Sequence, residues 1–215
     1  MCSSDLWAYR LMPVIGAMDV TAGMAVLFAP RGLALVYMVV WATWTALLRP
    51  LAGESVFETL ERAGNYGVPL ALILLTAMPR SLSGLLRLLD TPAAGDEALV
   101  RVRMVLKWTT VVLLVGHGAL GVSGKAMLTG HYATIGLPAA ATVIVGWFEI
   151  ALAVAVAMRP LAGLLVFVAA WKLGTEFLFV LAGAPVWELV ERAGSYAAPL
   201  ALAFLDRDRP IRPNR

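Results

Sequence analysis

The sequence predicts an all-α, polytopic membrane protein, and three observations carry that prediction. The chain has 215 residues, of which 60% are hydrophobic and 14% charged, and its mean hydropathy is +0.82. An ordinary soluble domain has about 25% charged residues, and a soluble fold of this size has no means of hiding so much apolar surface. In addition, seven segments are long and apolar enough to cross a bilayer, and part of the sequence is duplicated within the chain.

The seven segments approach the roughly 20 apolar residues that a spanning helix requires, with about 17 as a minimum. Most are separated by short links that contain proline and glycine, which predicts tight helical hairpins. The one long connector, at 79–97, has leucine pairs that predict a short interfacial helix. The predicted spans are 12–28, 32–48, 56–78, 98–124, 139–158, 161–182 and 186–205.

The internal duplication is clearest where VFETLERAGNYGVPLALILL at 56–75 returns as VWELVERAGSYAAPLALAFL at 186–205. An offset of 130 positions aligns 17–75 with 147–205 without a gap, and 23 of the 59 pairs are identical. Biased apolar composition would give roughly one match in ten by chance, so a duplication explains the similarity better.

The duplication predicts the organisation of the chain. The first three spans correspond to the last three, and the even number of crossings between each matched pair makes the repeats parallel, related by a two-fold axis along the membrane normal. The fourth span has no earlier counterpart. We therefore expect a three-helix repeat at 1–78, a cytoplasmic connector at 79–97, a four-helix unit at 98–205 and a basic tail at 206–215.

Charge distribution predicts the orientation. Arginine and lysine gather in the links on one side of the predicted spans, and basic loops stay in the cytoplasm. This pattern places the N-terminus outside and the C-terminus inside a bacterial cytoplasmic membrane. Residues 1–10 lack the features of a cleavable signal, so we expect the first span to be retained. The single cysteine, Cys2, excludes an internal disulfide or a thiolate metal cluster.

A repeated motif of two glutamates, an arginine and a tyrosine provides the first set of candidate site residues. On a continuous helix, Glu58, Arg62 and Tyr66 would share one face, with the glutamate and the arginine paired at i,i+4. Two interpretations stay open: the pairs lock neighbouring helices near the outer interface, or they line a cavity between the repeats. The motif residues are Glu58, Glu61, Arg62 and Tyr66 in the first copy and Glu188, Glu191, Arg192 and Tyr196 in the second.

Charges in the middle of predicted spans form the second set. Asp19 aligns with Glu149, and Lys172 lies one helical turn before Glu176. An isolated charge in hydrocarbon costs at least about 2.5 to 3.5 kcal/mol, so each group should face the bundle and find a partner. We expect Lys172 to pair with Glu176 or Glu149, either as a neutralised packing contact or as part of proton or substrate handling.

The remaining candidates are an aligned pair of tryptophans and the polar end of the fourth span. Trp41 and Trp171 lie near mid-membrane, away from the interfacial belt, where they would shape a cavity or fill the core. His117 would donate a hydrogen bond to a carbonyl-bearing ligand, relay a proton, or form a hydrogen bond with a neighbouring helix. Haem would need two histidines at membrane depth, and a di-iron site would need Glu-x-x-His, so the sequence predicts no metal site.

The second half of the chain resembles the DoxX-like family of small four-helix bacterial membrane proteins, which includes DoxD and MauE relatives. The resemblance rests on Gly121-x-x-Gly124-Lys125, on Ile135-Gly-Leu-Pro138, on Gly146-Trp-Phe-Glu149-Ile and on the Arg159-Pro turn. It implies a link to quinone-coupled or thiol redox systems and makes Lys125 and Glu149 positions of the family pattern, without a catalytic role. The additional N-terminal spans and the missing cysteine pair depart from that pattern.

Three functions follow as hypotheses. The resemblance favours an auxiliary subunit of a quinone-linked redox system, not catalytic by itself, with a membrane or periplasmic redox partner. A quinone would lie between the tryptophans, and His117 or Tyr196 would donate hydrogen bonds to its carbonyl oxygens. The alternatives are a small-solute or proton-coupled carrier with Asp19, Glu149 and Lys172 at its centre, and a structural assembly subunit. The lipid bilayer is the expected environment, homo-oligomers fit each hypothesis, and no nucleic-acid partner is expected. No nucleophile triad or phosphate loop names a reaction.

Overall fold

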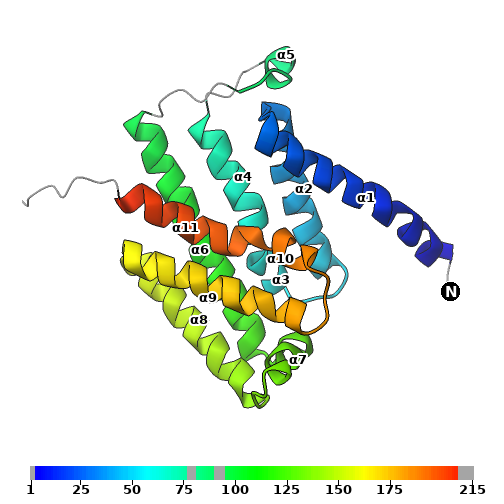
Figure 1. Ribbon diagram of the computed structural model, residues 1–215, viewed down its shortest axis with the longest axis vertical. Helices are drawn as coiled ribbons and strands as arrows, with labels where there is room; N and C mark the ends of the chain where they lie inside the picture. Colours follow the sequence, from blue (N-terminus) through cyan, green and yellow to red (C-terminus); the bar gives the residue numbers. More distant parts are fainter. Residues whose placement is uncertain (1–2, 77–80, 90–94, 208–215) are drawn as a thin grey trace, which may run out of the picture.

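The computed structural model describes residues 3–76, 81–89 and 95–207, and all regular secondary structure within these ranges is helical (Figure 1). An isolated bridge between Arg31 and Leu88 joins the start of the second helix to the connector. The helices are α1 (Ser3–Phe28), α2 (Gly32–Leu51), α3 (Phe57–Glu61), α4 (Ala63–Leu75), α5 (Leu82–Leu85), α6 (Asp96–Val122), α7 (Ala126–Thr134), α8 (Ala140–Met158), α9 (Ala162–Leu181), α10 (Trp187–Glu191) and α11 (Ala193–Arg207).

Among the residues that the structure describes, four helices are long and apolar enough to cross a membrane. They coincide with four of the seven predicted spans, the first, second, fifth and sixth. Many large apolar side chains of these helices point outward, which suits contact with lipid acyl chains and would be unfavourable in water. The four helices are Arg10–Phe28 within α1, α2, α8 and α9.

The fourth predicted span forms α6, which runs through the middle of the bundle and contacts α3, α4, α8 and α11 (Figure 1). Glycines let the backbones approach, because a Cβ atom at Gly118, Gly121 or Gly146 would overlap the facing helix. Small residues at such crossings are typical of helix packing in membranes, where close van der Waals contact is the main driving force.

The third and seventh predicted spans differ from the expectation of continuous helices. Each divides at its arginine into a five-residue helix and a longer helix, α3 with α4 and α10 with α11. Arg62 has φ −87° and ψ 9°, and Arg192 has φ −89° and ψ 8°, well away from the helical ψ of about −42°. Neither sequence contains a proline at this point, and the arginine at each break forms an ion pair with the other copy.

Other positions separated by 130 residues also share their local geometry. Gly53 and Gly183, which follow α2 and α9, have φ of 91° and 94°, a conformation that favours glycine. Thr45 donates to the carbonyl of Ala42, and Thr175 donates to that of Lys172, the equivalent residue. The duplication in sequence is therefore accompanied by equal backbone geometry at these positions.

The halves of the chain meet where α4 crosses α11. A Cβ atom at Gly64 would overlap the backbone of Gly194 and Ser195, and one at Gly194 would overlap Gly64. The same helices contribute to an apolar core, which contains side chains of α4, α6, α8, α9 and α11, including Leu113, Leu165 and Leu202. The glycine contact thus fixes how closely the two motif-bearing helices approach.

The connectors are short helices. The interfacial helix predicted in 79–97 is represented by α5, which is only four residues long and begins at the N-cap Ser81. Part of this connector, the end of the third predicted span and most of the 206–215 tail lie outside the described residues. Between α6 and α8, α7 covers the end of the bundle that holds the repeated motifs (Figure 1).

Candidate functional site: a buried charge network

The centre of the candidate site is a group of four ionisable side chains enclosed by α6, α8 and α9. Lys172 Nζ lies 3.1 Å from Glu176 Oε1 and 3.4 Å from Glu149 Oε1. Glu149 Oε2 lies 2.5 Å from His117 Nδ1. All four side chains are at most 3% exposed. The expected pairing of Lys172 with Glu149 or Glu176 is confirmed, and it includes both carboxylates at once.

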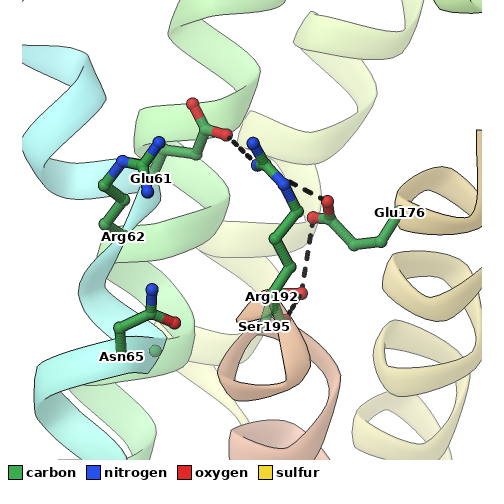
Figure 2. A pocket seen from close by; sticks show the side chains of 7 residues that line it. Glu61, Arg62, Asn65, Glu176, Arg192 and Ser195 are labelled. Atoms are coloured by element: carbon green, nitrogen blue, oxygen red, sulfur yellow. Dashed lines mark hydrogen bonds and ion pairs between the residues drawn. The ribbon is translucent and has the colours of Figure 1, made fainter. Parts of the chain in front are cut away.

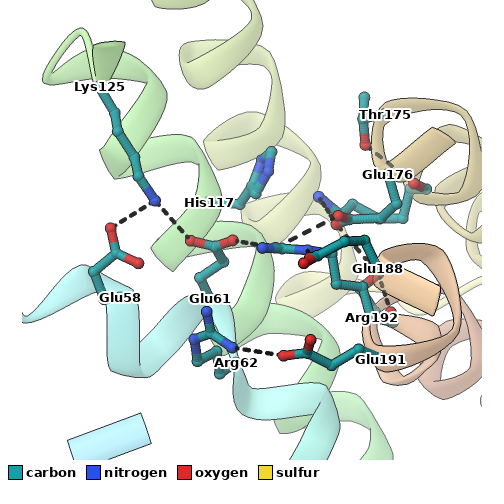
Figure 3. Close-up of polar contacts among 12 residues, drawn as sticks. Glu58, Glu61, Arg62, His117, Lys125, Thr175, Glu176, Glu188, Glu191 and Arg192 are labelled. Carbon is teal, nitrogen blue, oxygen red and sulfur yellow. Dashed lines mark hydrogen bonds and ion pairs between the residues drawn. The ribbon is translucent and has the colours of Figure 1, made fainter. Parts of the chain in front are cut away.

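The two copies of the motif add a second layer by exchanging ion pairs across the α4–α11 contact (Figure 3). Arg192 Nη1 lies 2.8 Å from Glu61 Oε1, and Arg62 Nη1 lies 3.3 Å from Glu191 Oε1. Arg192 also lies 3.7 Å from Glu176 Oε2, which connects this layer to the buried centre. Since each arginine pairs with the glutamate of the other copy, neither copy completes the site alone.

The outer end of the network is formed by Glu58 and Lys125. Lys125 Nζ lies 2.6 Å from Glu58 Oε1 and 3.7 Å from Glu61 Oε2, as Figure 3 shows. Lys125 is the N-cap of α7 and its side chain is 21% exposed, whereas both glutamates are buried. The network therefore extends from a partly exposed lysine to the enclosed His117.

The pairing predicted within each motif is wrong for the first copy. Glu58 pairs with Lys125 at 2.6 Å, while Arg62 pairs with Glu191 of the other copy. In the second copy, Glu188 Oε2 and Arg192 Nε are 3.7 Å apart, so the i,i+4 contact exists there but is longer than the contact of Arg192 with Glu61.

A small cavity separates the two layers (Figure 2). Its volume of about 10 Å³ is close to the space of one water molecule. Glu61 Oε2 and Glu176 Oε2 are buried without a hydrogen-bond partner among the described residues, as is Arg192 Nε. The volume of the cavity and the polar groups that line it fit one bound water molecule. The lining residues are Glu61, Arg62, Gly64, Asn65, Glu176, Arg192 and Ser195.

The two tryptophans have different surroundings. Trp171 belongs to the network, because its Nε1 donates to Glu149 Oε1 at 3.1 Å while its ring packs edge-on against Phe148. Trp41 stacks on Tyr37 and is a hydrogen-bond partner of Asp19. Asp19, on the exposed α1, does not reach Glu149 or Lys172. The structure thus brings together one tryptophan and one member of the aligned acid pair.

Both motif tyrosines have structural contacts. Tyr66 Oη donates to the carbonyl of Thr59, and Tyr196 Oη donates to that of Leu189, which is the equivalent position. These bonds tie each longer helix to the short helix before it. The hydroxyl of Tyr196 is therefore engaged within the protein.

Three contributors lie outside the set of candidate site residues. Ser195 Oγ lies 3.3 Å from Glu176 Oε1, and the Arg192 guanidinium lies 3.9 Å from the centre of the Phe179 ring. The imidazole of His131, on α7, also packs against that ring, with 4.1 Å between the ring centres. Burial lowers the pKa of the His131 imidazole, and the nearby charge of Arg192 acts in the same direction. The polar Ser195 beside a proline-freed carbonyl was a usable signal, whereas nothing marked Phe179 or His131.

Two further features bear on ligands. Within the described part of the chain, no group of three or more His, Cys, Asp or Glu side chains is arranged to hold a metal ion. An open apolar groove of about 430 Å³ lies between α1 and α2, beside Tyr37. The hydroxyl of Tyr37 has no hydrogen-bond partner among the described residues.

The chain was compared with protein-family models, with curated proteins and with solved structures, and none of them matches. The residues and their geometry are therefore the basis for any functional conclusion.

Proposed function

We propose that the protein is a polytopic membrane protein of the cytoplasmic membrane that carries protons, alone or together with a small solute, through the charge network between two parallel repeats. The observation that carries the proposal is the complete burial of Glu149, Lys172, Glu176 and His117 in one connected cluster. Ionisable groups at membrane depth are costly, and in membrane proteins they mark ion pathways and proton relays.

The architecture supports this proposal. Equal backbone geometry at Arg62 and Arg192, together with the exchanged ion pairs, is what a two-fold relation between the halves would produce. Transporters built from repeats hold their substrate sites at the repeat interface. The exchanged ion pairs of Arg62 with Glu191 and of Arg192 with Glu61 would lie at that interface, and the buried cluster adjoins them within the second repeat.

The spacing of the groups supports proton movement in particular. Three carboxylates would carry the path: Glu61 and Glu176 both contact Arg192, at 2.8 and 3.7 Å, and Glu176 and Glu149 both contact Lys172, at 3.1 and 3.4 Å. Arg192 keeps its protons, and the two cations hold the carboxylates close together. The single-water cavity lies at the step between the glutamates of the two layers, where a water molecule would bridge carboxylate oxygens that lack donors.

Charge balance assigns His117 a role at the inner end. The network of the described residues holds more carboxylates than cations, since Glu58, Glu61, Glu149, Glu176, Glu188 and Glu191 contact Lys125, Lys172, Arg62 and Arg192. A proton on His117 would offset one of the excess negative charges, at the carboxylate of Glu149. We therefore assign His117 and Glu149 as the pair that holds the transferable proton.

The quinone-linked function has one specific observation in its favour, the apolar groove between α1 and α2. The groove is open, with a volume of about 430 Å³, and Tyr37 would donate to a carbonyl oxygen of a bound ring. The contacts of Trp171 and Tyr196 within the protein make the originally expected quinone position less suitable. A quinone that co-purifies with the protein and is lost in the Tyr37→Phe variant would favour this function.

Proton flux in liposomes tests the leading proposal. The protein is reconstituted with a pH-sensitive dye inside, and a potassium diffusion potential drives proton entry. We expect acidification above that of empty liposomes, and we expect Glu149→Gln to reduce it to the empty-liposome rate. Glu54→Gln is the matched control, because Glu54 forms an exposed ion pair with Arg49. Flux that is equal in all variants, or absent from the unaltered protein, contradicts the proposal.

A double variant separates transport from a purely structural role. Glu149→Gln alone leaves Lys172 less well compensated and can destabilise the fold, whereas Glu149→Gln with Lys172→Met removes one charge of each sign. If the network only holds helices together, the double variant regains stability and no variant changes flux. If it carries protons, flux stays lost although stability returns.

A further inference from the structure

We propose that the exposed face of α1 that carries Gly16 and Asp19 is the docking site for a transmembrane helix of a partner protein. The partner helix would have an imidazole or a cationic side chain at mid-depth, followed by small residues. This inference rests on the two-repeat architecture proposed above and concerns the place where the repeats differ.

The second repeat shows what covers the equivalent face. On α8, Gly146 and Glu149 lie against α6: a Cβ atom at Gly146 would overlap the backbone of Gly118 and Val122, and Glu149 binds His117. The face of α8 is therefore satisfied by a helix that combines close glycine packing with an imidazole.

On α1 the same positions are open. Gly16 and Asp19 precede Gly146 and Glu149 by 130 residues. A Cβ atom at Gly16 or at Gly23 would meet nothing within 4 Å. None of the 10–28 window is buried, compared with 33% of the equivalent window of α8. No helix of the described residues occupies the position on α1 that α6 has on α8.

The carboxylate of Asp19 determines which side chain the partner helix should carry. In both repeats the acid contacts the aligned tryptophan, Trp41 for Asp19 and Trp171 for Glu149. Glu149 has a second, basic partner, whereas no ion pair of Asp19 occurs among the described residues. A carboxylate in the middle of a lipid-facing helix is costly, so a cationic or imidazole donor is the complementary group.

A partner helix fits this face better than a second copy of the chain. The α6 helix of a second copy is enclosed by its own α3, α4, α8 and α11. Two α1 faces brought together would place one Asp19 against the other, and like charges at close range are unfavourable.

Disulfide cross-linking with a probe helix tests the proposal. The probe is residues 96–125 expressed as a separate span with Gly118→Cys, because it has the chemistry required of the partner. The full chain carries Cys2→Ser, which removes its only cysteine, and Gly16→Cys. The control replaces Gly16→Cys with Met18→Cys, at similar depth but in the groove between α1 and α2.

We expect a cross-link from position 16 and little from position 18. Asp19→Asn, or His117→Leu in the probe, should lower the yield about threefold or more, the factor of one interhelical hydrogen bond in a membrane. Equal yields at both positions, or no cross-link, overturn the proposal. A covalent dimer of full chains through position 16 also overturns it and assigns the face to a second copy.

A separate pair of cysteines distinguishes failure of the docking site from failure of the architecture. Asn65 and Ser195 are equivalent positions that line the same small cavity. A disulfide between Asn65→Cys and Ser195→Cys in the full chain supports the α4–α11 contact. If it forms while position 16 does not react, the docking site alone is wrong; if it fails to form, the docking site falls together with the two-repeat arrangement.

Discussion

At the scale of single residues, the arrangement of charge around Lys172 decides what the buried centre tolerates. Lys172 is the cation shared by Glu149 and Glu176, and its side chain is 1% exposed. A buried ion pair is weak evidence for net stability, but removal of one partner leaves the other charge uncompensated. The centre is therefore sensitive to single substitutions and tolerant of charge-balanced ones.

We expect Lys172→Met to destabilise the protein by about 3 to 5 kcal/mol, because Glu149 and Glu176 would both lose the buried cation that they share. Thermal unfolding in detergent, followed by loss of the monodisperse species, measures the effect. Arg49→Met is the control, since its ion pair with Glu54 is exposed and such pairs contribute about 0 to 1 kcal/mol. Equal stabilities of the two variants would contradict the compensation that we assign to Lys172.

At the scale of elements, the crossing of α4 and α11 positions the exchanged ion pairs. Because Gly64 and Gly194 touch through their backbones, Arg62 and Arg192 start close enough to reach the glutamates of the opposite copy. The divided helices contribute as well, since each arginine lies at the break between two helical segments.

Gly64→Ala should destabilise the bundle by about 1 to 3 kcal/mol, the usual effect of overpacking, and should lower proton flux. Its control is Gly174→Ala on α9, where an added Cβ atom meets nothing within 4 Å. That control should be neutral or slightly stabilising, because alanine favours a helix more than glycine does. Proton flux and thermal stability are measured as for the charge variants. A Gly64→Ala protein with unchanged flux and stability would contradict the close backbone contact of α4 and α11.

At the scale of the whole molecule, the outward apolar side chains and the buried charges invert the usual arrangement of a soluble protein. Trp147 and Met158 are 59% and 79% exposed, whereas Lys172 and Glu149 are each 1% exposed. In a bilayer this distribution is favourable, because lipid meets the apolar surface and the charges neutralise one another inside.

The orientation leads to a labelling prediction for the intact membrane. In a Cys2→Ser background, Glu54→Cys should react with a membrane-impermeant maleimide added from outside, since its loop lies on the less basic side. Arg159→Cys, in the turn between α8 and α9, should react only after the membrane is opened. The reverse pattern would show that the protein has the opposite orientation in the membrane. External reaction of both positions would contradict the parallel repeats.

The sequence by itself determined the helical class, the four long apolar helices and the identity of most network residues. The apolar composition indicates that the surface faces lipid. Burying Lys172 or Glu149 alone costs free energy, so each of these groups requires a partner of opposite charge. The duplication likewise identified which positions should be equivalent. These conclusions need only properties of residues and their spacing along the chain.

Only the tertiary structure decided which groups pair. Periodicity assumed a continuous helix through Arg62 and so paired it with Glu58, whereas the helix divides there and the pairing passes to Glu191 of the other copy. The stacking of Phe179 under Arg192 and the open face of α1 also depend on how distant segments approach. An ion pair forms only when the charged atoms come within a few ångströms of each other. The helix crossings set those distances, and the spacing of residues along the sequence does not predict the crossings.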